Sequence, residues 1–121
     1  MISTIEDLAE IGLTNGAAYA IKMLKKESDS NPGAFPFSEN DLNQLGYRFL
    51  YELNRIDDAI EIFKFYIEIY PQSANACDSL GEAYFLNGNL DLAAIHYKKS
   101  LQLNPENKNA SLMLRQIYAQ H

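Results

Sequence analysis

The feature that most constrains this chain of 121 residues is a spacing that occurs three times between an alanine and a proline. Proline cannot continue a helix, because it lacks the backbone N–H and its ring clashes with the preceding turn. Each alanine-to-proline segment therefore predicts a helix that ends near its proline. Pro71 and Pro105 lie 34 residues apart, which indicates a repeated unit. The three pairs, each twelve residues apart, are Ala20 and Pro32, Ala59 and Pro71, and Ala93 and Pro105.

The last complete unit, residues 74–105, predicts two helices joined by a turn at Asn87 and Gly88. Glycine accepts the left-handed conformation that often ends a helix. Small and large apolar residues occupy fixed offsets in this unit and in the one before it. The pattern resembles the tetratricopeptide repeat, a helix–turn–helix unit of about 34 residues. The positions that carry the resemblance are Gly46, Ala59, Phe63, Pro71, Leu80, Gly81, Tyr84, Ala93, Tyr97 and Pro105.

This resemblance implies an all-α fold, a right-handed solenoid of about seven helices in three and a half repeats. A repeat cannot bury its apolar face alone, so neighbouring repeats must stack and the end repeats are atypical. We expect one domain over residues 1–121. Its expected parts are a degenerate N-terminal capping pair (1–32), two repeats (38–71 and 74–105) and a C-terminal capping helix (107–119).

Local signals predict where helices begin and which residues face the core. Apolar residues at i, i+3, i+4 and i+7 mark one buried helix face. The expected helix starts are the capping boxes Ser3 with Glu6 and Ser38 with Asp41, a cap at Asn15, and the acidic pair Asp57 and Asp58. The expected inward residues are Ile5, Leu8 and Ala9; Ala17, Ala20, Ile21 and Leu24; Leu42, Leu45, Phe49 and Leu53; Ala59, Ile60, Phe63 and Ile67; and Ala110, Leu114, Ile117 and Tyr118.

Two irregularities interrupt the pattern. The loop GAFPF at residues 33–37 carries two phenylalanines, which either cover the end of the first helix pair or form a docking surface. The middle repeat also has one residue more than the last, with 13 positions from Gly46 to Ala59 against 12 from Gly81 to Ala93.

Composition and charge exclude several classes of function. A net charge of −6 disfavours binding to nucleic acid or to an anionic membrane surface. The sequence contains no catalytic motif, no metal-ligand cluster and no sign of a cofactor, and its single cysteine, Cys77, lies on an expected core face. Neither His96 nor His121 has a catalytic partner at helical spacing. We therefore expect a non-catalytic protein without metal or cofactor.

The run from residue 38 to 105 also resembles the repeat region that follows the catalytic domain in some bacterial serine hydrolases of esterase and β-lactamase-like types. That resemblance implies an accessory role and transfers no catalytic residue. Without a signal or membrane segment the expected location is the cytoplasm, or the periplasm or exterior if the chain belongs to a larger hydrolase.

Comparison with chaperone-binding repeats argues against one partner. Repeat domains that grip the acidic tails of heat-shock chaperones use lysine, asparagine and arginine on their inner helices. The matching positions here include two acids, Asp78 and Glu82, beside Asn43 and Tyr47. An acidic tail would be repelled by these carboxylates.

The expected function is protein or peptide binding in the concave groove of the solenoid, which the first helices of successive repeats would line. Accessory contacts with a hydrolase and self-association, as a weak homo-oligomer, are the alternatives. Tyrosine suits a binding groove because it supplies a large contact area with few rotatable bonds. The acids favour a partner with lysine or arginine. The expected groove residues are Asn40, Asn43, Tyr47, Tyr51, Asn75, Asp78, Glu82, Phe85, Leu112 and Gln116.

Overall fold

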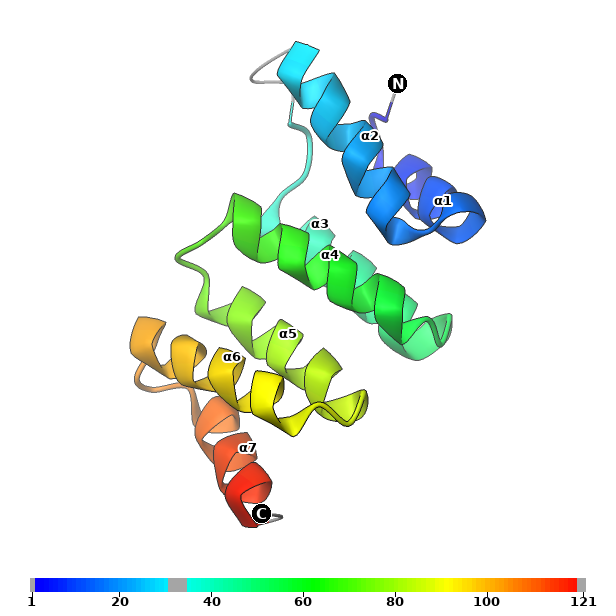
Figure 1. Cartoon of the computed structure of the whole chain (residues 1–121). Helices are drawn as coiled ribbons and strands as arrows, with labels where there is room; N and C mark the ends of the chain where they lie inside the picture. The colour runs from blue at the N-terminus through cyan, green and yellow to red at the C-terminus, as the bar shows by residue number, and fades with distance from the viewer. Residues whose placement is uncertain (1, 31–34, 120–121) are drawn as a thin grey trace. The chain divides into compact units, whose positions relative to one another are not determined.

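The computed structural model describes residues 2–30 and 35–119, and all regular structure in these two ranges is helical. Seven α-helices are present there, as predicted, together with one short π-helical turn, η1, that continues α3 (Figure 1). The elements are α1 (Ile5–Asn15), α2 (Ala17–Ser30), α3 (Glu39–Tyr47), η1 (Arg48–Glu52), α4 (Ile56–Ile69), α5 (Ala74–Leu86), α6 (Leu90–Leu103) and α7 (Lys108–Ala119).

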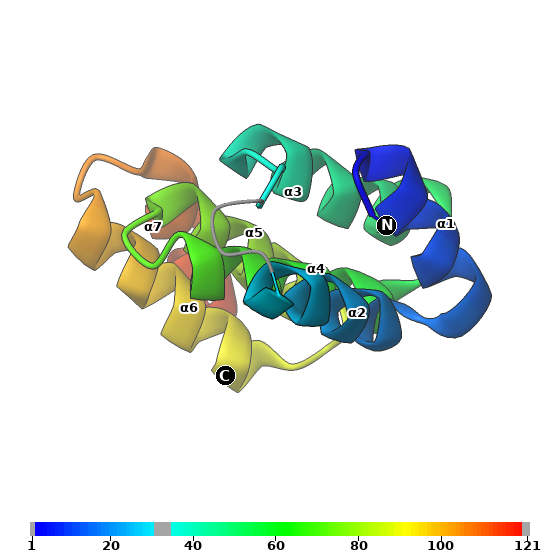
Figure 2. The ribbon, with the colours of Figure 1, turned by 90° about the horizontal axis from the view of Figure 1, so that it is seen from above.

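The chain divides into two compact units, unit 1 at Met1–Phe65 and unit 2 at Tyr66–His121, with the boundary inside α4. Unit 1 holds the hairpin of α1 and α2 and most of the hairpin formed by α3, η1 and α4. Unit 2 holds the hairpin of α5 and α6, followed by α7 (Figures 1 and 2). One domain over the whole chain stays a prediction.

The core of unit 1 forms where α3 meets α4. Leu42, Phe49, Ala59 and Phe63 are fully buried. A Cβ atom at Gly46 would clash with the ring of Phe63, so glycine lets the two helices approach closely. These four buried residues agree with the inward faces predicted for the two helices. Three residues of the first two hairpins that were expected in the core, Ile5, Leu53 and Ile67, are only half-buried.

The core of unit 2 forms where α5 meets α6. Leu80, Ala93 and Tyr97 are buried, and a Cβ atom at Gly81 would lie 3.1 Å from the ring of Tyr97. Tyr118 of α7, expected to face inward, is 52% exposed. The corresponding Tyr84 is covered by His96 of the following helix, stacked at 5.5 Å. Tyr118 has Lys98 of the preceding helix above its ring instead.

Two of the expected helix caps are corrected. Thr4 and Asp7, one residue beyond Ser3 and Glu6, form the capping box of α1, because the Thr4 hydroxyl accepts the Asp7 N–H and the Asp7 carboxylate accepts the Thr4 N–H. The Asp7 carboxylate also accepts the Ser3 N–H. Asn15 is the last residue of α1 and does not cap α2. The box at Ser38 and Asp41 and the acidic start of α4 at Asp57 and Asp58 are confirmed.

The described part of the phenylalanine-rich loop covers the molecule's own surface. Phe37 is buried, and the Phe35 ring packs edge-on against it at 5.7 Å and lies 6.0 Å from Phe65 of α4. The contact with Phe65 is with the second hairpin, so the interpretation that the two rings cover the end of the first helix pair stays a prediction. Pro32 and residues 33 and 34 lie outside the described residues, as does His121.

Candidate functional site

A surface hollow of about 460 Å³ in unit 1 contains three of the residues expected to bind a partner. It opens between α1 on one side and α3 with η1 on the other. Figure 2 shows α1 and α3 side by side. Asn43, Tyr47 and Tyr51 lie in its lining, whereas Asn40 is exposed on α3 outside it. The full lining is Ile5, Glu6, Asp41, Asn43, Gln44, Leu45, Tyr47, Arg48, Tyr51 and Glu52.

Two stacked tyrosines form the aromatic part of the hollow. The rings of Tyr47 and Tyr51 are nearly parallel, at 6° with centroids 6.0 Å apart. Tyr47 also packs edge-on against the buried Phe63 at 5.1 Å, so its orientation is fixed by the core. Tyr51 is 54% exposed. The pair therefore presents an aromatic surface to solvent on a rigid base.

The hollow contains more acidic than basic side chains. Arg48 contacts Glu6 of α1 at 3.2 Å and Glu52 at 4.0 Å. Asp41 adds a third carboxylate to this single guanidinium, and one of its oxygens accepts the Ser38 N–H. The hollow is therefore acidic overall, with the side chains of Glu6 and Glu52 about three-quarters exposed.

The extra residue of the middle repeat lies in η1, which supplies part of this lining. From Asn54 onward the middle and last repeats match at an offset of 34 residues, but Gly46 matches Gly81 at an offset of 35. Both hairpins turn on a left-handed residue, with φ of 53° at Asn54 and 82° at Gly88. The additional position falls within the π-helical turn.

Hydrogen bonds at the two hairpin turns show the same difference. In the middle repeat the Arg55 N–H donates to the Phe49 carbonyl six residues earlier, at 2.8 Å. In the last repeat the Asn89 N–H donates to the Tyr84 carbonyl five residues earlier, at 2.9 Å. A π-helical turn accommodates one residue more than an α-helical turn, and such turns are frequent at functional sites. Three lining residues, Arg48, Tyr51 and Glu52, belong to η1.

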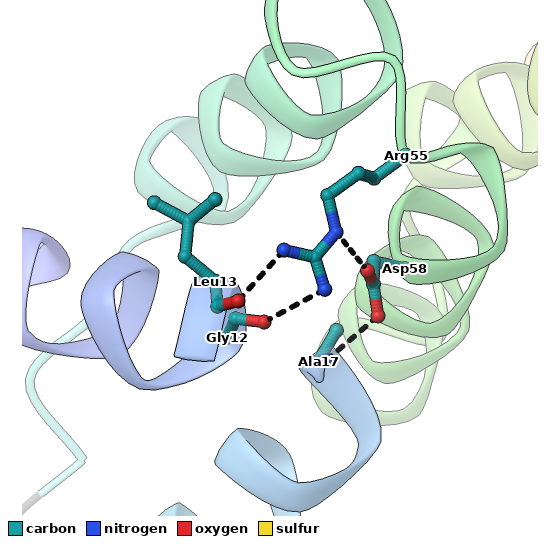
Figure 3. Close-up of polar contacts among 5 residues, drawn as sticks. All are labelled: Gly12, Leu13, Ala17, Arg55 and Asp58. Atoms are coloured by element: carbon teal, nitrogen blue, oxygen red, sulfur yellow. Dashed lines mark hydrogen bonds and ion pairs between the residues drawn. The ribbon is translucent and has the colours of Figure 1, made fainter. Parts of the chain in front are cut away.

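An Arg55–Asp58 pair at the start of α4 bonds the end of α1 and the beginning of α2 (Figure 3). The Arg55 guanidinium donates to the Leu13 carbonyl at 2.8 Å and to the Gly12 carbonyl at 3.3 Å, at the end of α1. It also donates to the Asp58 carboxylate at 2.7 Å. The other Asp58 oxygen accepts the N–H of Ala17, the first residue of α2.

This pair places each charge at the helix end that favours it. The cation meets the carbonyls at the C-terminus of α1, and the carboxylate meets the free N–H at the N-terminus of α2. This contact was not predicted from the sequence. Asp58 was predicted only to stabilise the start of its own helix. No local sequence pattern indicates a hydrogen bond with Ala17, 41 residues away.

In unit 2 the expected binding residues lie on α5 and α7. Asp78 accepts hydrogen bonds from Asn107 at 3.2 Å and from Asn109 at 3.1 and 3.0 Å. Burial raises the pKa of Asp78, which these amide hydrogen bonds partly offset. Asn109, Leu112 and Gln116 share one face of α7 by their spacing, so the bonds from Asn109 bring that face to Asp78.

The other expected groove residues of unit 2 differ in their partners and in their exposure. Asn75 donates to the hydroxyl of the buried Tyr66 at 3.3 Å, which gives it a structural partner. Glu82 and Phe85 are half-buried, and Leu112 and Gln116 are exposed. Unit 2 therefore uses two of the expected groove residues, Asn75 and Asp78, in contacts within the fold.

No group of three or more histidine, cysteine, aspartate or glutamate side chains is placed to hold a metal ion in residues 2–30 and 35–119. Within the same ranges, no helix is long and apolar enough to cross a membrane.

Comparison with known proteins bears on the family. Residues 74–107 match the family model described as the tetratricopeptide repeat. The chain also resembles a solved structure, the first tetratricopeptide domain of Spaghetti (RPAP3) bound to the HSP90 peptide SRMEEVD. The TM-score is 0.65 at 20% identity, over 96% of this chain and 89% of that one. These matches support the tetratricopeptide repeat family. The predicted fold class, an all-α solenoid of tetratricopeptide type, is confirmed.

Curated relatives match a shorter part of the chain. Protein arginine N-methyltransferase 9 of Xenopus laevis is 38% identical over 61 residues, and that of Mus musculus is 34% identical over 61 residues. Each match covers 50% of this chain and 7% of the relative. These relatives are animal proteins, so they lend no support to the expected bacterial origin or to the expected link with serine hydrolases.

In the matched segment 74–107, α5 is the first helix of a repeat. The predicted repeat layout gives the same position to α1, to α3 with η1, and to α7. The hollow of unit 1 lies between two such helices, α1 and α3, and the Asp78 contacts of unit 2 join two others, α5 and α7. The residues that pack one helix against the next therefore recur between the hairpins, whereas the residues on these helix faces differ from one hairpin to another.

Proposed function

We propose that this chain is a non-catalytic module that binds a protein or peptide segment through the faces of its first helices. The observation that carries the proposal is the hollow of unit 1, where an exposed tyrosine is stacked on a second tyrosine anchored by the core. A rigid aromatic surface in a concave site is a usual feature of binding pockets, because little conformational freedom is lost when a ligand docks.

The structural neighbour supports the general activity. That protein was solved with a bound peptide, and its fold covers nearly the whole of this chain. At 20% identity the likeness concerns the fold, so the identity of the ligand must come from this chain's own residues.

The charge of those residues disfavours the neighbour's own peptide as the ligand. The sequence SRMEEVD carries three acidic residues and one arginine. The hollow of unit 1 presents three carboxylates and one guanidinium, and the α5 face adds Asp78 and Glu82. Repulsion between like charges would weaken binding of an acidic segment. We therefore propose a partner that is not an acidic tail.

Two other roles rest on weaker support. An accessory role beside a serine hydrolase has only the sequence resemblance of residues 38–105 behind it. Self-association would use exposed apolar side chains such as Leu86, Ile95 and Leu112 of unit 2, each about half exposed. Light scattering over a range of concentrations tests the second of these directly.

Selection from a random-peptide library tests the proposed function. The purified chain is immobilised and displayed dodecamers are selected on it. Enriched peptides are then measured by titration against the wild type and against a Tyr47→Ala, Tyr51→Ala, Phe85→Ala variant. We expect enriched peptides that lose most of their affinity for the variant, with circular dichroism confirming that it keeps its helices.

Two results contradict the proposal. The first is a selection that enriches no peptide above background. The second is a set of peptides that bind the wild type and the triple variant equally well, which would place binding elsewhere on the molecule. A Tyr118→Ala variant serves as the matched control, because Tyr118 is as exposed as Tyr51 but lies on α7 outside the hollow.

A further inference from the structure

We propose that the hollow of unit 1 binds the arginine side chain of an extended peptide segment. This inference rests on the proposed function and names the chemistry of the partner at one part of the site. Its basis is the combination of a flat aromatic surface, an excess of carboxylates and the exposed side-chain amide of Gln44 in a hollow of about 460 Å³.

The aromatic surface favours a planar cation. Tyr51 lies parallel to Tyr47, and more than half of Tyr51 is exposed. A guanidinium group stacks flat on such a ring and is attracted by its negative face. Because Tyr47 is held against Phe63, the surface is already oriented before any ligand arrives.

The charges around the hollow complement a cation. Glu6 and Glu52 both contact Arg48, and Asp41 completes a set of three carboxylates against one guanidinium. Each carboxylate can accept more than one hydrogen bond, so Glu6 and Glu52 can share Arg48 with an incoming donor. An acidic side chain in the same place would meet an excess of like charge.

Arginine fits this arrangement better than lysine does. Its guanidinium donates hydrogen bonds in one plane, so that it can lie on the Tyr51 ring while its edge reaches carboxylates at the rim. The exposed side-chain amide of Gln44 also lines the hollow and carries both donors and an acceptor, which match the backbone groups of an extended peptide.

The π-helical turn is the structural reason that this chemistry is assembled here. Arg48, Tyr51 and Glu52 all belong to η1. The last repeat lacks the additional residue and ends its first helix as an ordinary α-helix, α5. The proposed arginine site is therefore specific to the middle repeat.

The test uses blocked heptapeptides that carry no charge except at the central residue, which is arginine, citrulline, lysine or glutamate. Binding to the full chain is followed by amide chemical-shift changes in two-dimensional NMR. Citrulline keeps the shape of arginine but has no charge. We expect the citrulline peptide to bind at least about tenfold more weakly, because charge-assisted hydrogen bonds are lost.

Variants locate the site on the molecule. We expect Tyr51→Leu to weaken the arginine peptide by about two- to fivefold, as expected for the loss of a cation–aromatic contact at a partly exposed site. Tyr118→Leu, the control, should leave binding unchanged. The largest shifts with wild type should fall on amides of the hollow, including Glu6 and Glu52.

Equal binding of the arginine and citrulline peptides would overturn the inference, as would equal or tighter binding of the lysine or glutamate peptide. Shift changes confined to residues outside the hollow would also overturn it. Failure of the proposed function looks different, because the library selection would then enrich no peptide whose binding depends on the tyrosines. Enriched, tyrosine-dependent peptides without an arginine preference would leave the proposed function intact and reject this inference alone.

Discussion

The carboxylate of Asp58 accepts a hydrogen bond from the backbone N–H of Ala17 at 2.8 Å, although the two residues lie 41 positions apart in the sequence. The side chain of Asp58 thus acts as the N-terminal cap of α2 from a different helix, α4. Its second oxygen binds Arg55, which reaches the last carbonyls of α1. The connection between the first two helices is therefore completed by residues of the next hairpin.

Replacing Asp58 should consequently destabilise unit 1. We expect Asp58→Ala to lower the free energy of unfolding by about 1–2 kcal/mol, the usual cost of losing a helix cap. Asp57→Ala is the matched control, because Asp57 is exposed at the same helix start and should cost under about 1 kcal/mol through the macrodipole. Urea unfolding followed by circular dichroism measures both. Equal losses for the two variants would argue against the cap.

The two repeat glycines should respond differently to alanine. At Gly46 an added Cβ clashes with the fully buried Phe63 ring, whereas at Gly81 it would lie 3.1 Å from the Tyr97 ring and requires only a small shift. We expect Gly46→Ala to destabilise the protein by about 1–3 kcal/mol through overpacking. Gly81→Ala should be closer to neutral, since alanine favours the helix by up to about 1 kcal/mol. Thermal melting of both variants measures the two changes in stability. A larger loss of stability for Gly81→Ala than for Gly46→Ala would contradict the packing described for Gly46.

The environment of Asp78 predicts a pH dependence of stability. Burial raises the pKa of Asp78 above its ordinary value of 3.8, so the folded protein holds this proton more tightly than the unfolded chain does. The folded state is therefore stabilised below pH 3.8 and loses that contribution as the pH rises through the folded pKa. Asp78→Asn does not titrate, so its stability relative to wild type should increase over the same range and then stay constant.

Paired unfolding measurements of wild type and Asp78→Asn, from about pH 3 to pH 7, test this linkage. The difference between the two proteins is the relevant quantity, because the other carboxyl groups titrate in both. A constant offset is expected from the altered hydrogen bond to Asn109. A difference that does not change with pH, or that favours wild type increasingly as the pH rises, would contradict the assigned pKa direction.

The π-helical turn predicts that one residue of the middle repeat can be deleted. Removing Glu52 restores the 12-residue spacing of the last repeat between the glycine and the alanine, and we expect the turn to become α-helical. The variant should stay folded and helical, with core contacts such as Gly46 against Phe63 retained. It should lose affinity for the tyrosine-dependent peptides, because Arg48 and Tyr51 would no longer face the hollow together.

Circular dichroism and peptide titration separate the two parts of this prediction. A Glu52→Gln substitution is the control, since it changes the charge but keeps the length of the turn. Unfolding of the deletion variant would mean that the extra residue is needed for packing. Unchanged peptide affinity would mean that the turn does not shape the binding surface.

Most of the fold could be predicted from the sequence because the helices and turns follow a repeated spacing of residues that are close together in the chain. The spacing from Ala93 to Pro105, repeated earlier in the chain, defines helix lengths, and Gly46 and Gly81 mark close approaches that the structure confirms. Capping boxes are also local, but here two overlapping candidates had the same spacing. The choice of Thr4 over Ser3 followed from a hydrogen bond geometry that spacing alone does not define.

Contacts between distant segments could not be predicted in this way. The bonds that Arg55 donates to α1 and that Ala17 donates to Asp58 join residues about 40 positions apart, and no periodicity in the sequence predicts them. The number of residues between Gly46 and Ala59 showed that the middle repeat has one additional residue. That number does not tell whether the additional residue lies in a loop or in a helix. Of the expected groove residues, Asn43, Tyr47 and Tyr51 line the hollow. The binding role of every expected groove residue stays a prediction.

The π-helical turn has a consequence for how such arrays change over evolution. An insertion inside a helix normally rotates every later side chain by about 100° and would move core residues to the surface. Here the change in length is confined to η1, and beyond Asn54 the middle repeat again aligns with the last at 34 residues. One inserted codon can thus give a single repeat a new outer surface while the inherited helix packing on both sides is retained.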